Sequence, residues 1–266
     1  MINAALYKRG LRRSALLLAV LCAVTAMYIW IIISMFQPET AKMLDEYARL
    51  MPELMAAVGM TAGATTLIAF MCSYLYGFIL PVFPMLFCIV RANALIAGQV
   101  DNCSMVSLLA APVKRRTIVL TQLVVLLSGI LILDVFSTVL EIIGAEFYFP
   151  GELDVAALLL LNIGLLFLHL FIGGICFLAS CLFSDAKRSL GFGAGIPILM
   201  YVLKMLSNLG GNAENAKYFT FFTLFDPNGI VAGNSGAITG MIVLLIGAVI
   251  LFTAGIAVFC RKDLNI

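Results

Sequence analysis

The sequence predicts an all-α integral membrane protein with six transmembrane helices. Of its 266 residues, 63% are hydrophobic and 11% are charged, whereas roughly 25% of the residues of a typical soluble domain are charged. Its uncharged stretches are long enough to cross a bilayer, which takes about 20 mostly apolar residues in a helix. Lipid tails can face apolar side chains directly, so a chain with few polar residues is stable there.

Six long uncharged stretches, separated by charged segments, define the expected spans. Residues 1–13 carry four basic side chains and precede an apolar stretch of about 23 residues, which is longer than the apolar region of a signal peptide. We therefore expect residues 1–13 to form a short interfacial helix that leads into the first span. The expected spans cover residues 14–36, 56–90, 117–140, 155–183, 189–203 and 237–260.

The second stretch, residues 56–90, is longer than a span requires. As a single helix it would be about 52 Å long, and the hydrocarbon core is roughly 30 Å thick. Pro81 and Pro84 lie in its second half, where proline kinks or ends a helix. We expect a span followed by a bent extension, with two short re-entrant segments as the alternative.

The fifth stretch contains Gly191, Gly193 and Gly195 ahead of Pro197. Such a run resembles a nucleotide-binding loop, but it lies inside an apolar span with no strand before it. Small residues let membrane helices pack closely, so close helix packing is the better interpretation.

Basic residues are distributed unequally between the two sides of the expected membrane. Six spans place both termini on one side, and Lys and Arg concentrate on the cytoplasmic side of membrane proteins. Most acids, Glu141 among them, fall on the opposite side. The N- and C-termini are therefore predicted to be cytoplasmic. The basic residues on their side are Lys8, Arg9, Arg12, Arg13, Arg91, Lys114, Arg115, Arg116, Lys187, Arg188, Arg261 and Lys262.

The sequence lacks the common motifs of nucleotide and hydrolytic chemistry. It contains no G-x-x-x-x-G-K-[ST], no H-E-x-x-H and no G-x-S-x-G pattern. The single histidine, His169, excludes a site built from several histidines, and the seven cysteines are interpreted as reduced packing residues. We therefore expect no catalytic site, metal or cofactor on this chain, and any ATPase to be a separate chain.

The loop after the second span carries the most informative pattern. Residues 103–111 are predicted to form a short amphipathic helix that places Met105, Leu108 and Leu109 on one face. Pro112 ends this helix, and a basic cluster follows. An apolar face of this kind requires a partner or the membrane surface to cover it.

Three segments of the chain resemble the ABC-2 type transporter permeases. The loop resembles their signature G-T-x-x-x-L-L-x-x-P-V-[ST]-R, although the first two positions differ from the Gly-Thr of the family. Residues 221–229 and 258–264 are similar to the family's segment before the last span and to its ending F-x-[RK]-[RK]-D-L. The signature positions are Cys103, Ser104, Leu108, Leu109, Pro112, Val113, Lys114 and Arg115.

The resemblance implies one ABC-2 type transmembrane domain over residues 1–266. Two such chains, identical or different, would pair and recruit two cytoplasmic ABC ATPases that bind ATP and Mg. The loop would dock into the ATPase as a coupling helix; the alternative is that residues 114–116 only enforce topology. No nucleic acid partner is expected. The resemblance carries the docking role onto Asp101, Leu108, Leu109, Pro112, Lys114 and Arg115.

Three polar residues inside the expected spans are candidates for the translocation path. Asp134 is the only acid in an expected span. It lies about 26 Å along the third span, near the outer boundary of the membrane. The alternative to a place on the path is a side chain that reaches water at this boundary, and this alternative is slightly favoured. His169 lies halfway along the fourth span, either on the path or as a neutral side chain bonded to another helix. Asn162 lies two turns earlier and shares its face.

These observations lead to the hypothesis of an exporter permease in the cytoplasmic membrane. The expected cargo is amphipathic or hydrophobic, and antimicrobial or toxin peptides are favoured because small permeases of the family resemble exporters of phenol-soluble modulins. The alternatives are export of a lipid, drug or glycan, and a non-transporting membrane scaffold or immunity protein. An intramembrane enzyme needs a nucleophile with a base, paired acids or a metal site, and the expected spans contain few residues that could form one.

Overall fold

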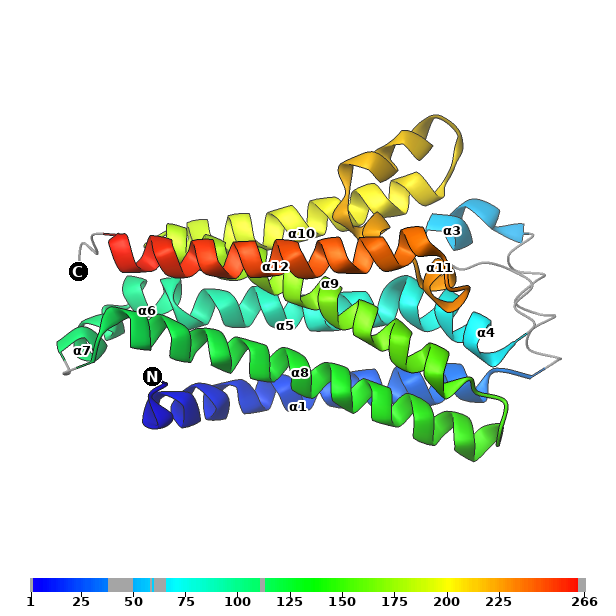
Figure 1. The fold of residues 1–266 in the computed structure, drawn as a ribbon, viewed down its shortest axis with the longest axis horizontal. Coiled ribbons are helices and arrows are strands. Elements are labelled where there is room, and N and C mark those ends of the chain that lie inside the picture. Colours follow the sequence, from blue (N-terminus) through cyan, green and yellow to red (C-terminus); the bar gives the residue numbers. More distant parts are fainter. Residues whose placement is uncertain (1, 38–49, 58, 60–65, 111–112, 263–266) are drawn as a thin grey trace.

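The protein is a bundle of long helices that run roughly parallel to one another (Figure 1). The computed structural model describes residues 2–37, 50–57, 59, 66–110 and 113–262. Within these ranges all regular structure is helical, and six segments are long and apolar enough to cross a membrane. The all-α class and the six candidate spans are therefore confirmed. The spans are α1 (Ala4–Ser34), Leu67–Asp101, α8 (Arg115–Tyr148), α9 (Val155–Leu182), α10 (Ala186–Asn208) and α12 (Ser235–Arg261).

The predicted ends of the fourth and sixth spans lie within two residues of α9 and α12, but three other helices are longer than expected. Helix α1 begins at Ala4, so residues 4–13 continue directly into the first span. Helix α8 extends eight residues beyond the predicted end at 140, and α10 extends beyond both predicted ends and includes Lys204. The predicted spans end at charged residues, yet α8 continues through Glu141, whose carboxylate is bonded inside the bundle.

The second span differs most from its prediction. It begins at Leu67, where the Thr66 hydroxyl accepts a hydrogen bond from the Ala69 amide, and not at residue 56. It runs through α4 (Leu67–Tyr74), a π-helical turn η1 (Leu75–Ile79), α5 (Leu80–Leu95) and α6 (Ala97–Asp101). Figure 1 shows these segments following one another along the bundle, so the alternative of two re-entrant segments is wrong. Residues 52–57 form the separate short helix α3 (Pro52–Ala57).

The two prolines of this span do not end the helix, because both lie within α5. Pro81 occupies the first turn of α5, where a helix does not need the missing N–H. The irregular π-helical turn immediately precedes it. The Gly77 carbonyl, four residues before Pro81, accepts a hydrogen bond of 3.1 Å from the Tyr201 hydroxyl of α10. A neighbouring helix thus satisfies the backbone group that proline leaves without its helical donor.

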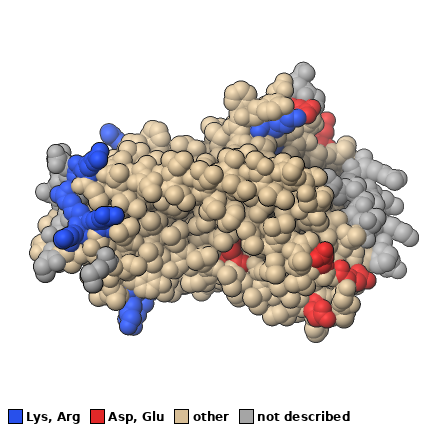
Figure 2. Space-filling model, viewed as in Figure 1, with Lys and Arg blue, Asp and Glu red and all other residues tan. Residues whose placement is uncertain are grey.

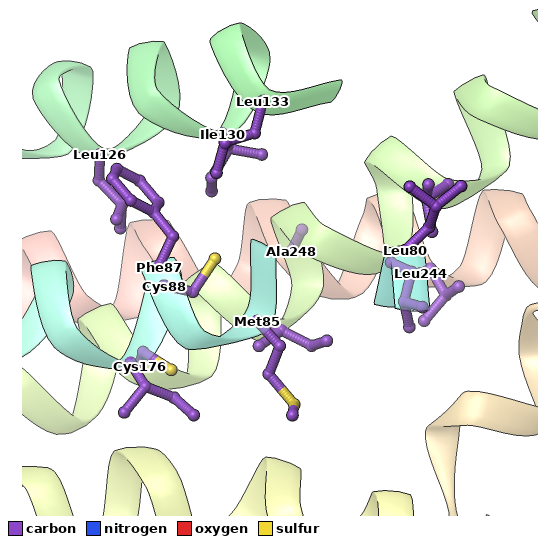
Figure 3. Packing of buried hydrophobic residues seen from close by; sticks show 14 of the residues in the cluster. Leu80, Met85, Phe87, Cys88, Leu126, Ile130, Leu133, Cys176, Leu244 and Ala248 are labelled. Atoms are coloured by element: carbon purple, nitrogen blue, oxygen red, sulfur yellow. The ribbon is translucent and has the colours of Figure 1, made fainter. Parts of the chain in front are cut away.

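The span Leu67–Asp101 is the central helix of the bundle. Two thirds of its most apolar window is buried (67%), against 22–28% for α1, α10 and α12. Figure 3 shows Phe87 of α5 directed at Leu126 and Ile130 of α8. A Cβ at Gly129 would overlap the Phe87 ring, so this glycine makes room for it. The weakly buried helices leave apolar side chains on the outside of the bundle, where lipid would cover them.

Close packing explains one of the three glycines of α10. A Cβ on Gly193 would lie 3.6 Å from the Cα of Cys176, so α10 approaches the α9 backbone at this point. Nothing in the described part of the chain lies within 4 Å of such an atom on Gly191 or Gly195. The packing interpretation is confirmed at Gly193 alone.

A sharper packing requirement exists at Gly240 of α12. A Cβ there would collide with the backbone carbonyl of Leu224 in η3 (Phe221–Leu224). We expect Gly240→Ala to lower the free energy of unfolding by about 1–3 kcal/mol, because backbone cannot move aside as a side chain can. Thermal unfolding in detergent measures this. The matched control is Gly236→Ala, one turn earlier, where an added Cβ would meet no atom of the described residues within 4 Å. An equal loss in both variants would contradict the prediction.

Candidate functional site

Five buried polar side chains connect α8, α9 and the π-helical turn. His169 Nδ1 of α9 lies 2.9 Å from Asp134 Oδ1 of α8. Glu141 Oε2 of α8 accepts hydrogen bonds from Asn162 Nδ2 of α9 at 2.8 Å and from the Tyr76 hydroxyl at 2.9 Å. At most 6% of any of these residues is exposed. We call Tyr76, Asp134, Glu141, Asn162 and His169 the polar ladder.

The polar ladder follows from one repeated spacing. Asp134 and Glu141 are seven residues apart on α8, and Asn162 and His169 are seven residues apart on α9. Seven residues make two helical turns, so each pair lies on one face of its helix. Because α8 and α9 are antiparallel neighbours, both cross-helix contacts form in the same register.

Each cross-helix pair retains unused hydrogen-bonding capacity. Asp134 Oδ2, Glu141 Oε1, Asn162 Oδ1 and His169 Nε2 are buried and contact no partner among the described residues. A carboxyl group against an imidazole can exchange a proton, and ionisable groups within spans are functional candidates. Across the described residues, no three His, Cys, Asp or Glu side chains are placed to hold a metal ion.

The structure corrects the position predicted for Asp134. The favoured interpretation had it reaching water at the outer boundary, but it is 4% exposed and faces His169. The cause is the length of α8, which continues 14 residues, or about 21 Å, beyond Asp134. For His169, the predicted bond to another helix is confirmed. Asn162 is also buried on the face of α9 that meets α8.

Glu141 and Tyr76 are the two ladder residues that are not among the candidates from the sequence. The charge of Glu141 ends an uncharged stretch, so the sequence predicts a position in the outer loop. The seven-residue spacing from Asp134 was the signal that could have identified it, since that spacing returns to the same helix face. Tyr76 carried no comparable signal, because its role depends on the contact between the second span and α8.

The predicted short helix after the second span is present as α7 (Ser104–Ala110). Met105 is fully buried and Leu108 is half-buried, and both pack against the protein's own core. This part of the apolar face is therefore covered within the chain and not by a partner. The side chains of Val106 and Ser107 are exposed instead. The side chain of Leu109 and all of Pro112 lie outside the described residues.

The charged residues predicted to dock the ATPase are exposed near α7. Asp101 ends α6, and Lys114 immediately precedes α8. Arg115 Nη1 donates to the Lys262 carbonyl at 3.0 Å. Lys262 Nζ in turn donates to the Leu182 carbonyl at the end of α9 at 2.7 Å, and partial burial lowers the pKa of Lys262. The ending that resembles the family therefore ties α8, α9 and α12 together.

One end of the bundle is basic. Helix α1 begins there, α12 ends there, and α6 and α7 lie at the same end (Figure 1). Figure 2 shows Lys and Arg gathered at this end, and Asp and Glu mainly towards the other. We call it the basic end. The predicted separation of charge is thus present in three dimensions.

The opposite end holds the second segment that resembles the family. Residues 221–229 contribute to η3 and α11 (Pro227–Val231) and line a cavity of about 390 Å³. Lys204 of α10 lines the same cavity. Phe225 from this segment also contacts the ring of Tyr76, with 6.5 Å between ring centroids. This cavity therefore adjoins the polar ladder through Phe225.

Comparisons with protein-family models, with curated proteins and with solved structures found no match. The residues and their arrangement are therefore the basis for a function. The arrangement consists of a multi-pass helical bundle, a polar ladder inside it, and a basic end that carries the α6–α7 loop.

Proposed function

We propose that this chain is the transmembrane permease subunit of an ATP-driven exporter of the ABC-2 type. One observation carries the proposal: the three segments that resemble the family occur in the family's order, in a chain with six candidate spans. The α6–α7 loop also lies at the end where α1 begins and α12 ends. An ATPase in the cytoplasm could reach the loop there if that end is cytoplasmic.

In this proposal the basic end faces the cytoplasm and the bundle resides in the cytoplasmic membrane. Twelve of the 16 Lys and Arg residues lie on the side assigned to the cytoplasm, as the positive-inside rule requires. Two ABC ATPases, which bind ATP and Mg, dock at α7, and a second permease chain completes the membrane domain. In this orientation residues 1–13 lie at the cytoplasmic interface of the membrane.

The proposed cargo is amphipathic or hydrophobic, with antimicrobial or toxin peptides as the favoured class. The described parts of the chain outside the spans are short. Short loops suit a permease that takes cargo from the membrane better than a protein with a large external receptor domain. The polar ladder is the proposed internal element of transport. It lies next to the cavity at the opposite end, where cargo would leave.

Co-purification tests the proposal and the docking surface together. We expect the tagged chain, extracted gently from its native membrane, to recover a P-loop ATPase. Val106→Glu and Lys114→Glu should greatly reduce that recovery. Val106 is exposed on α7 and gains a negative charge, and Lys114 is exposed just after α7 and has its charge reversed. Mass spectrometry identifies and quantifies the recovered protein.

Lys8→Glu is the matched control, since Lys8 is an exposed basic residue of α1 outside the loop. If the α7 variants still recover the ATPase, the permease proposal stands and the docking site lies elsewhere on the chain. If no ATPase is recovered even after crosslinking, the permease proposal fails, and the scaffold or immunity protein becomes the better hypothesis.

A further inference from the structure

A cavity of about 330 Å³ lies at the basic end, between α1, α5, α6, α7 and α8. Arg9 and Arg13 of α1 and Arg91 of α5 line it, and none of the described residues in its lining is acidic. Gln99, Ser104 and Gln122 contribute further polar groups. We call this the basic cavity.

Two of its buried side chains have unused polar atoms. Arg91 is 8% exposed; its Nη2 donates to the Gly10 carbonyl at 3.3 Å, while its Nε has no hydrogen-bond partner among the described residues. Gln122 is 1% exposed; its Nε2 donates to Gln99 at 3.3 Å, and its Oε1 has no partner in the described chain. Both residues line the cavity, so its wall includes a buried guanidinium and a buried amide whose hydrogen bonding within the described residues is incomplete.

The charge of Arg91 is also unbalanced. Among the described residues, ion pairs within 4.0 Å occur only between His169 and Asp134 and between Lys217 and Glu214. A buried guanidinium without a counterion is costly, and two further arginines at the same cavity add repulsion. An anion in the basic cavity would remove both costs.

A centred α8 would place the basic cavity at the depth of lipid head groups. Helix α8 has 34 residues and is about 51 Å long, so about 10 Å extends beyond each side of a centred, roughly 30 Å hydrocarbon core. Gln122 is seven residues from the start of α8, which is also about 10 Å. A phosphate near Gln122 would therefore lie where the phosphates of a bilayer lie.

We propose that the basic cavity binds the phosphate group of an anionic phospholipid, held by Arg13 and Arg91. Guanidinium groups match the oxygens of phosphate in pairs, and basic pockets between membrane helices suit lipid head groups. Leu6, Leu95 and Leu108 form the apolar wall against which the glycerol can pack. The ligand contacts α7 as well as α1, so lipid composition would affect how α7 is held.

The test uses the full chain purified in detergent. It is mixed with phosphatidylglycerol or phosphatidylcholine of identical acyl chains, and native mass spectrometry measures the lipid retained. We expect preferential retention of phosphatidylglycerol, weakened about tenfold by Arg13→Gln, because one charge-assisted contact is lost. Arg12→Gln is the matched control: Arg12 is the exposed neighbour on the same helix and does not line the cavity.

Arg91→Gln should weaken retention at least as much. Because Arg91 also donates to Gly10, its thermal unfolding is measured in parallel, and Arg13→Gln decides the outcome if the Arg91 variant unfolds. Inorganic phosphate is the third ligand. Phosphate that stabilises the native chain and the Arg12→Gln variant, but not the Arg13→Gln variant, would show binding at this cavity. If the two lipids are then retained equally, the site is supported with a soluble phosphate as its ligand.

Equal behaviour of Arg12→Gln and Arg13→Gln towards all three ligands would overturn the proposal. This experiment requires no ATPase and no cargo. Its outcome is therefore independent of the proposed exporter function.

Discussion

Replacing His169 with alanine is expected to lower the free energy of unfolding by about 3 kcal/mol and to abolish transport. The variant leaves the Asp134 carboxyl buried with neither oxygen bonded to another side chain, and removing one partner of a buried pair is costly both in proteins and in membranes. Thermal unfolding in detergent measures stability. Transport is measured as the survival of cells exposed to an antimicrobial or toxin peptide when they produce the chain together with its ATPase.

A double variant separates the structural from the functional role of this pair. Asp134→Ala combined with His169→Leu replaces both polar partners with apolar groups, which often restores stability. We expect the free energy of unfolding to return to within about 1 kcal/mol of the native value, while transport stays lost. Native transport by the double variant, or by His169→Ala, would show that the pair serves folding alone.

Glu141→Leu is expected to lower the free energy of unfolding by about 2 kcal/mol. Tyr76 and Asn162 both donate to one oxygen of Glu141, so leucine leaves two buried donors without that acceptor. Glu141→Gln retains a carbonyl oxygen at that position and should cost less than about 1 kcal/mol. Thermal unfolding of the two variants gives the comparison.

The matched control for this comparison is Glu146→Leu, an exposed acid on the same helix. An equal loss in Glu141→Leu and Glu146→Leu would contradict the role assigned to the buried carboxylate. Transport by a well-folded Glu141→Gln variant tests the charge separately: native transport would show that the acceptor matters and the charge does not.

Composition and the lengths of apolar stretches were sufficient to predict the helical class and the six spans. They located α9 and α12 closely because charged segments bound both helices. They place the ends of α8 and α10 too early, because the charged residues Glu141 and Lys204 lie within these helices. A charge ends a span only if it must reach water, and an internal partner removes that need for Glu141.

The contacts of the candidate site could be predicted only in part. That His169 bonds another helix followed from its depth, but its partner depends on the register between α8 and α9, which the sequence pattern does not specify. The burial of Met105 and Leu108 was missed for a similar reason. Amphipathic spacing indicates which face is apolar, and tertiary structure decides what covers it.

The equal spacing of the polar ladder also limits how the bundle can move. Sliding α9 along α8 by one turn would carry His169 and Asn162 about 5 Å past their partners and separate both pairs at once. The two helices should therefore travel as a rigid hairpin. Tyr76 also ties the π-helical turn to this hairpin. Relative motion is therefore left to other helix contacts, above all those of the lightly buried α10, whose Tyr201 hydroxyl bonds the Gly77 carbonyl.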